Sequence, residues 1–162
     1  MYEILIVGGG PAGLTAAIYA ARAGKHVAVL ERGSTGGQII SAPLVENYPG
    51  IPSVSGTELA RQMTEQACTF GAEIVYTEAV GLEKTPAGFR VLCTDGVREA
   101  KTVILATGAA HRRLDLPWET TLTGCGVSYC AVCDGAFYEG LDVAVVGGGD
   151  TAVQDALLLA NT

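Results

Sequence analysis

Strand-like and helix-like stretches alternate at the start of the chain. Residues 2–7 (YEILIV) form a β-rich run that ends in three glycines. The alanine-rich stretch 14–23 predicts a helix, and 26–30 (HVAVL) predicts a second strand that is followed by Glu31. A strand, a glycine turn, a helix and a further strand in this order are typical of a parallel β-sheet.

The following residues predict a loop, a helix and three more strands. Residues 32–55 contain several Gly and Pro breakers and predict a loop. Apolar residues at helical spacing predict an amphipathic helix over 57–70. The runs 73–80 and 89–93 predict strands of a small antiparallel element, and 102–106 predicts another buried strand.

The design of residues 2–22 recurs at the other end of the chain. Residues 143–146 (VAVV) predict a strand, 147–149 a glycine turn and 151–160 a helix. The composition changes at 108–116 (GAAHRRLDL), which we interpret as a crossover between two domains. The expected fold class is therefore α/β.

Composition and charge exclude several classes of protein. The formal net charge of the 162 residues is -7, which disfavours binding to a nucleic-acid backbone. No apolar run is long enough to cross a bilayer, and the N-terminus has no secretory signal. The five cysteines are odd in number and mostly far apart, which favours a redox or metal role in the cytoplasm over a disulfide-stapled secreted domain.

Residues 8–13 (GGGPAG) form a GxGxxG motif between a predicted strand and a predicted helix. Gly8 permits the tight turn, Gly10 lets the backbone approach a pyrophosphate, and Gly13 lets the helix pack closely on the strand. Glu31 ends the next strand, where its carboxylate can hold ribose hydroxyls and would repel a 2′-phosphate. The motif predicts FAD or NAD rather than NADP, although a glycine turn without a ligand is the alternative in a glycine-rich chain.

Residues 147–152 (GGGDTA) form a second motif, a GxGxxA, after the predicted strand VAVV. Alanine is an accepted third residue in such turns. The alternative is again a turn without a ligand. The position that would distinguish NAD from NADP lies beyond Thr162.

Cys130 and Cys133 form a CxxC pair. On a helical turn, positions i and i+3 lie about 5–6 Å apart, which is within reach of a disulfide. Three alternatives stay open: an inert buried pair, a zinc site that would need two more ligands, and an iron–sulfur cluster. Together with Cys125 the pair has the C-x4-C-x2-C spacing of plant-type ferredoxins. We expect a redox disulfide and no metal.

Asp134 follows the pair directly. A carboxylate beside the cysteines would oppose thiolate formation, so it does not activate a nucleophile. We interpret it as a general acid that supplies a proton as a disulfide is cleaved. The alternative is a solvated turn residue.

With these motifs in their order, the chain closely resembles low-molecular-weight thioredoxin reductases. The similarity covers essentially the whole chain and is carried by IVGGGPAGLTAA, STGGQI, VENYPG, TVILATGA, GVSYCAVCDG and VAVVGGGDTA. GVSYCAVCDG is the most specific, because it lies between two nucleotide motifs, whereas glutathione-reductase-type enzymes carry their redox pair early in the flavin domain.

The resemblance implies an incomplete, Rossmann-like doubly wound FAD/NAD(P)-binding fold. Residues 1–109 would be the first segment of the FAD-binding domain. Residues 110–162 would begin an inserted NADPH-binding domain that carries the CxxC and is truncated. The segment His111–Arg113 would be a solvated crossover rather than the family's NADPH-phosphate motif.

The implied activity is that of an NADPH-dependent thioredoxin-disulfide reductase. Electrons would pass from NADPH to FAD, then to the Cys130–Cys133 disulfide and finally to thioredoxin. Cys133 would lie against the flavin, Cys130 would attack the thioredoxin disulfide, and Asp134 would be the acid.

The resemblance also implies the cofactor contacts. The FAD contacts would be Gly8, Gly10, Pro11, Ala12, Gly13, Glu31, Arg32, Gly36, Gly37, Gln38, Asn47, Ala106, Thr107 and Gly108. The NADPH contacts would be Gly147, Gly149, Asp150, Thr151 and Ala152.

The expected partner is thioredoxin or a similar small dithiol protein, with no nucleic acid and no membrane. The full-length protein is expected to be a homodimer. We expect the sequence to stop before the enzyme is complete, and this piece alone to be inactive. Two other functions remain open: a related flavoprotein serving another carrier or electron donor, and a non-catalytic nucleotide-binding or iron–sulfur module.

Overall fold

A computed structural model describes residues 1–110 and 112–161 as two compact units. The first unit comprises residues 1–44 and 53–109, and the second comprises residues 45–52 and the described part of 110–162. His111, within the predicted crossover, and Thr162 lie outside the described residues. In the part of the chain that is described, no helix has the length and apolar character needed to cross a membrane.

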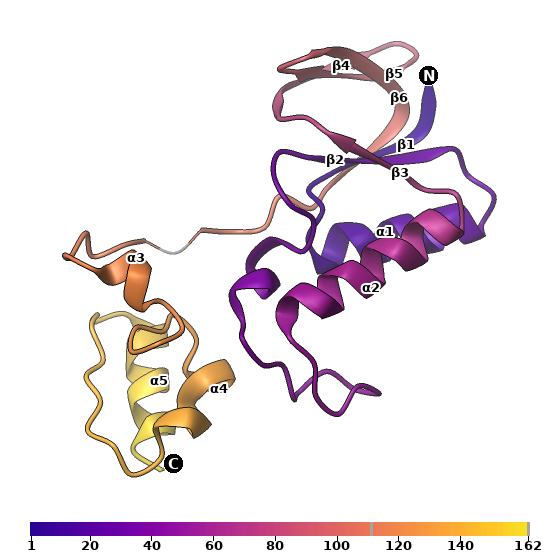
Figure 1. Cartoon of the computed structure of the whole chain (residues 1–162). Coiled ribbons are helices and arrows are strands. Elements are labelled where there is room, and N and C mark those ends of the chain that lie inside the picture. The colour runs from indigo at the N-terminus through magenta and orange to yellow at the C-terminus, as the bar shows by residue number, and fades with distance from the viewer. Residues whose placement is uncertain (111, 162) are drawn as a thin grey trace. The chain divides into compact units, whose positions relative to one another are not determined.

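The first unit contains a six-stranded sheet in the order β3-β2-β1-β6-β5-β4 (Figure 1). The strands are β1 (Tyr2–Val7), β2 (Val27–Glu31), β3 (Glu73–Tyr76), β4 (Ala79–Thr85), β5 (Gly88–Cys93) and β6 (Gly96–Leu105). β3, β2, β1 and the second half of β6 run parallel, whereas β5 pairs antiparallel with both β4 and the first half of β6. β6 therefore joins the parallel sheet to the antiparallel strands.

Two helices, α1 (Pro11–Arg22) and α2 (Gly56–Thr69), cover one face of this sheet (Figure 1). Side chains alternate between the faces of a strand, so Ile6 and Leu5 belong to different clusters. Ile6 packs with residues of α1 and α2, and Leu5 packs with β5 and the first part of β6. Burying each such side chain contributes about 1.5–3 kcal/mol. The α/β, Rossmann-like fold is thus confirmed.

Local sequence explains where the helices begin. Pro11 occupies the first turn of α1, where its missing N–H has no intrahelical acceptor to lose. α2 begins after Ser55, whose hydroxyl accepts the Glu58 N–H at 3.2 Å. The predicted helices 14–23 and 57–70 are present with ends shifted by one to three residues.

The predicted strands near the middle of the chain need two corrections. A single antiparallel strand over 73–80 is wrong, because β3 pairs parallel with β2 and β4 begins only at Ala79. Between them Thr77 is buried; its N–H donates to the Glu31 carbonyl at 2.9 Å and its hydroxyl to Asp95 Oδ1 at 2.5 Å. These contacts turn the chain. The strand predicted at 102–106 is the end of the longer β6.

The 3-10 helix after β2 was not predicted, whereas the strand at 89–93 was. The predicted loop 32–55 contains a short 3-10 helix, η1 (Gly37–Ser41). Strand β5 lies where 89–93 was predicted, and a tight turn connects it to β6.

The second unit is built from short helices in the described residues. They are α3 (Glu119–Leu122), α4 (Ala131–Asp134), η2 (Gly135–Tyr138) and α5 (Asp150–Leu159). α5 corresponds to the helix predicted at 151–160. It packs on the segment after the CxxC, because a Cβ on Gly135 would lie 3.1 Å from Leu159 Cδ2.

The strand predicted at 143–146 is wrong. The structure gives these residues no strand, and they are exposed. A strand needs a neighbour to receive its backbone hydrogen bonds, and no described segment pairs with VAVV. The apolar pattern of VAVV is β-prone, but these residues form no strand because they have no pairing partner in the described chain.

Candidate functional site

The first glycine turn joins β1 to α1 and admits no side chain at two positions. Gly8 has φ 108°, and a Cβ there would lie 2.2 Å from the Ala106 carbonyl oxygen. A Cβ on Gly13 would lie 1.9 Å from the Gly8 carbonyl oxygen. The end of β6 is held beside the turn by the Ala106 N–H, which donates to the Val7 carbonyl at 2.8 Å. Only glycine fits Gly8 and Gly13.

Glu31, at the end of β2, holds the same turn through both carboxylate oxygens. Oε2 accepts the Gly9 N–H at 2.8 Å, and Oε1 accepts the Gly33 N–H at 2.8 Å. Each oxygen of a carboxylate can accept a further hydrogen bond. The structure thus places an anchored carboxylate beside the glycine turn, with acceptor capacity left for a ligand.

A second glycine pair lies against the first turn. The Gly36 N–H donates to the Gly9 carbonyl at 2.7 Å, and a Cβ on Gly37 would lie 3.3 Å from Gly10 Cα. Gly36 and Gly37 both have positive φ, which favours glycine. The two glycine segments, separated by more than twenty residues, therefore form one backbone surface.

This surface fits the pyrophosphate of a dinucleotide. Among the described residues, no side chain caps the N-terminus of α1, and Ala12 there is exposed. Uncapped N–H groups and the positive end of a helix attract phosphate oxygens. A Cβ on Gly10 would meet only Gly37 Cα, at 3.9 Å, so the backbone at Gly10 is open to a ligand.

The other residues proposed for this site lie at varying distances from the first glycine turn. Thr107 and Gly108 follow β6, and Thr107 Cα would lie 3.3 Å from a Cβ on Gly8. The Gln38 side-chain amide donates to the Ala109 carbonyl. Arg32 is exposed and pairs with Glu78 at 3.8 Å. Asn47 is exposed on the segment 45–52, which groups with the second unit.

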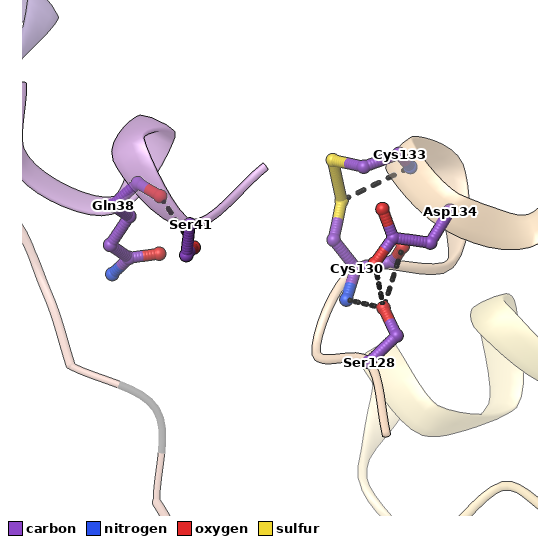
Figure 2. Close-up of a disulfide and its surroundings, with 6 residues drawn as sticks. All are labelled: Gln38, Ser41, Ser128, Cys130, Cys133 and Asp134. Carbon is purple, nitrogen blue, oxygen red and sulfur yellow. Dashed lines mark hydrogen bonds between the residues drawn. A yellow bond between two sulfur atoms is a disulfide. The ribbon is translucent and has the colours of Figure 1, made fainter. Parts of the chain in front are cut away.

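The CxxC pair forms a disulfide in the second unit. Figure 2 shows Cys130 and Cys133 joined at the start of α4, with Cα atoms 5.3 Å apart. Cys130 is the N-cap residue of α4, and its Sγ accepts the Cys133 N–H at 3.2 Å. Cys133 is exposed and Cys130 is half-buried.

Ser128 connects this disulfide to Asp134. Its hydroxyl donates to Asp134 Oδ2 at 2.5 Å and accepts the Cys130 N–H at 3.0 Å (Figure 2). A hydroxyl can also accept a hydrogen bond from a protonated carboxyl group, so Ser128 can hold Asp134 in either protonation state. Ser128 was not among the residues predicted from the sequence. The available signal was its position two residues before Cys130, where a serine commonly bonds nearby backbone.

The disulfide leaves no ligand set for an iron–sulfur cluster of the ferredoxin type. Two of the three cysteines with that spacing are bonded to each other, and Cys125 is exposed and free. In the residues that the structure describes, no group of three His, Cys, Asp or Glu side chains could hold a metal ion.

The second glycine turn leads into α5. Gly147 has φ 142°, and a Cβ there would lie 3.0 Å from the Ala152 side chain. Gly149 is the N-cap residue of α5, and its carbonyl accepts the Val153 N–H at 3.2 Å. Asp150 and Thr151 form the exposed first turn. This half of a strand–turn–helix unit presents a helix N-terminus without the strand that would normally precede it.

Together, the fold and these sites define an α/β protein with a dinucleotide-type turn and a disulfide beside a carboxyl group. Comparison with known proteins gives the same class. The family model described as "Pyridine nucleotide-disulphide oxidoreductase" matches residues 2–162. The chain belongs to this family.

Within the family, the chain is similar to thioredoxin reductases. That of Treponema pallidum is 45% identical over 160 residues, which cover 98% of this chain and 52% of the relative. That of Bacillus subtilis is 44% identical over 159 residues, covering 98% and 50%. The crystal structure of thioredoxin reductase from Streptococcus pyogenes MGAS5005 is 50% identical with a TM-score of 0.95, covering 99% of this chain and 53% of that one. The chain thus spans about half the length of the relatives it matches.

Proposed function

We propose that the protein carrying this chain is an NADPH-dependent thioredoxin-disulfide reductase that uses FAD. The observation that carries the proposal is the Cys130–Cys133 disulfide, which lies beside Asp134 and precedes a second nucleotide-type turn. The similarity to thioredoxin reductases over nearly the whole chain supports thioredoxin as the substrate. The full-length protein is further proposed to be a homodimer and a cytoplasmic enzyme.

The first unit would hold FAD. Gly8, Gly10 and Gly13 would face the pyrophosphate, and Glu31 would accept hydrogen bonds from the ribose. The remaining contacts proposed within this unit are Pro11, Ala12, Arg32, Gly36, Gly37, Gln38, Ala106, Thr107 and Gly108. Asn47, on the segment 45–52, is proposed as well. When bound, FAD supplies the two-electron chemistry that links a hydride donor to a disulfide.

The second glycine turn would hold NADPH. Gly147 and Gly149 allow the backbone to approach a phosphate, and Asp150, Thr151 and Ala152 begin the helix whose N-terminus would face it. The similarity to thioredoxin reductases favours NADPH over NADH.

Cys130 is the proposed nucleophile. In the dithiol form, the Cys133 N–H would hydrogen-bond the Cys130 sulfur as it does in the disulfide, which stabilises the thiolate. The Cys130 thiolate attacks the thioredoxin disulfide, forms a mixed disulfide and releases one thioredoxin thiolate. Cys133 then attacks the Cys130 sulfur, re-forms the observed disulfide and releases the second thioredoxin thiolate.

Asp134 is the proposed proton donor for the thiolates that leave thioredoxin. Its carboxyl group lies on the same turn as the disulfide and is oriented by the Ser128 hydroxyl. Because Ser128 also binds the Cys130 N–H, the acid and the nucleophile share one anchor.

The roles of the two cysteines can be separated in the full-length protein. The probe is thioredoxin with a single active-site cysteine that carries a thionitrobenzoate group. In Cys133→Ser the remaining Cys130 thiolate should displace the coloured thiolate and form a covalent complex, visible on a non-reducing gel. In Cys130→Ser the reaction should be about tenfold slower or more, because the hydrogen bond from the Cys133 N–H that stabilises the Cys130 thiolate is a bond to a charged group, worth about 1.5–3 kcal/mol.

Equal rates for the two variants would contradict the assignment of Cys130. A steady-state assay of the wild-type protein distinguishes carriers: NADPH consumption with thioredoxin, but not with another small dithiol protein, supports the proposed substrate. NADPH consumption with the other dithiol protein, but not with thioredoxin, would make that protein the substrate instead.

A further inference from the structure

One buried carboxylate in the second unit has no part in the reaction described above. Glu119 is the first residue of α3 and only 5% of its surface is exposed. Oε1 accepts the Leu114 N–H at 3.1 Å and the Tyr129 hydroxyl, and Oε2 accepts the Leu116 N–H at 3.1 Å. Burying a carboxylate is unfavourable unless hydrogen-bond donors from the surrounding chain replace its water, and here three donors do so.

The backbone before Glu119 is shaped to provide two of these donors. Asp115 has φ 57° and Trp118 has φ 70°, values that cost an ordinary residue about 1–2 kcal/mol. These residues turn the chain so that the N–H groups of Leu114 and Leu116 face one carboxylate. Such a strained segment persists only where its surroundings determine it.

The third donor leads directly to the disulfide. Tyr129 precedes Cys130, whose sulfur is bonded to Cys133. The chain returns to α3 before it reaches Tyr129, because the Val127 N–H donates to the Leu122 carbonyl at 2.9 Å. Glu119 therefore connects the segment 114–116 with the residue adjacent to the redox pair.

The charges in this cluster favour the hydrogen bond at neutral pH. The Tyr129 hydroxyl, together with the Leu114 and Leu116 N–H groups, holds the pKa of Glu119 below its usual value despite burial. The same bond to Glu119 raises the pKa of the Tyr129 phenol. Arg113 lies near the phenol, and its guanidinium donates to the Thr120 hydroxyl at 3.2 Å. Ionised Glu119 and neutral Tyr129 are thus the stable pair.

We propose that Glu119 is a positioning residue for the redox disulfide, which it holds by anchoring Tyr129 to the 114–116 segment. The anchor restricts the backbone at Cys130, so the two sulfurs spend more time within bonding distance and the disulfide is stabilised relative to the dithiol. The inference rests on the proposed function for the reaction that the disulfide performs.

The test uses the full-length protein and measures the disulfide equilibrium itself. Glu119→Gln, Tyr129→Phe and the double variant are equilibrated in dithiothreitol buffers, and the oxidised fraction of Cys130–Cys133 is determined by alkylation and mass spectrometry. We expect each single variant to lower the equilibrium constant for disulfide formation by about fivefold to tenfold, the effect of one charge-assisted hydrogen bond. The double variant should lower the constant about as far as the more affected single variant, because both single variants disrupt the Glu119–Tyr129 bond.

Tyr138→Phe is the matched control. It also removes one phenolic oxygen from the second unit, from a residue whose hydroxyl makes no hydrogen bond to the described residues, and it should leave the equilibrium constant unchanged. Unchanged constants in Tyr129→Phe, with an unchanged far-UV circular dichroism spectrum, would overturn the proposal. So would additive effects in the double variant.

Two further outcomes are distinguishable. If Glu119→Gln fails to fold, Tyr129→Phe decides alone, because it keeps the ring and removes a single atom. If the wild-type protein does not reduce thioredoxin, the proposed function fails, whereas the equilibrium measurement still tests the position of Glu119.

Discussion

At the residue scale, the first glycine turn combines positions that exclude a side chain with one carboxylate that holds the backbone. Gly8 and Gly13 are required by contacts with neighbouring carbonyl groups rather than by flexibility. Glu31 joins Gly9 and Gly33 through its two oxygens. The contacts of Gly13 and of Glu31 each lead to a prediction for a single substitution.

Replacing Gly13 with alanine should destabilise the protein although alanine is the better helix former. Helix propensity alone would favour alanine by about 1 kcal/mol. The added Cβ would, however, lie 1.9 Å from the Gly8 carbonyl oxygen, and such overpacking costs about 1–3 kcal/mol or more. Urea denaturation of the full-length protein measures the difference. Gly33→Ala is the control, because its Cβ would come no closer than 3.8 Å to Glu31, and equal losses in both variants would contradict the steric account.

Replacing Glu31 with alanine should weaken FAD binding by about tenfold or more. The variant loses the proposed ribose acceptor and also leaves the Gly9 and Gly33 N–H groups without their partner. Flavin retained after gel filtration of the full-length protein measures the effect. Glu83→Ala, which removes an exposed ion pair with Arg90, should retain its flavin. Equal retention by Glu31→Ala would remove Glu31 from the site.

At the element scale, short polar contacts decide where strands end and turn. Thr77 separates β3 from β4 and is bonded to Asp95 in the turn between β5 and β6. Arg98, on β6, donates two hydrogen bonds to the same carboxylate, at 2.7 and 2.8 Å. The corner of the sheet is therefore held by one carboxylate shared between two elements.

This carboxylate should make the first unit sensitive to acid. The bonds from Arg98, and then from Thr77, hold the pKa of Asp95 well below its usual value. A lowered pKa means that its contribution is present above the unfolded pKa, near 3.9, and is lost as the pH falls from there toward the folded pKa. The melting temperature of the wild-type protein should therefore fall more between pH 5 and about pH 2 than that of Asp95→Asn. Parallel curves would show that the cluster does not contribute.

At the scale of the whole molecule, apolar side chains remain uncovered in both units. Leu105 at the end of β6 is 64% exposed, and Val146 and Leu157 are 67% and 63% exposed. Exposed apolar residues in this number favour association with another surface. The chain also spans about half the length of its relatives.

We therefore expect the 162-residue chain alone to self-associate and not to reduce thioredoxin with NADPH. Sedimentation of the purified chain measures association, and loss of NADPH absorbance after loading with FAD measures turnover. The full-length protein is the control for both measurements. Turnover comparable to that of the full-length protein would show that this chain contains the complete site.

The elements and motifs that could be predicted from the sequence depend on residues close to one another along the chain. β-rich runs located the parallel strands, and an alanine-rich stretch and helical spacing of apolar residues located the longer helices, because local backbone geometry sets these preferences and periods. The spacing of GxGxxG predicted the turn between β1 and α1. The CxxC spacing predicted the disulfide, because three residues of a helical turn bring the two sulfurs within reach.

Tertiary structure alone decided the features that depend on distant residues. Val143–Val146 has a β-prone sequence, but a strand exists only where a neighbour accepts its hydrogen bonds. The division of 73–80 depends on Thr77 meeting Asp95, and the burial of Glu119 depends on Tyr129 and two amides of a strained turn. In the sequence, Glu119 and Thr77 are indistinguishable from ordinary surface polar residues, because only the fold buries them. The sequence by itself determined the local chemistry, and the fold decided which of those groups meet, because long-range contacts have no signature in local spacing.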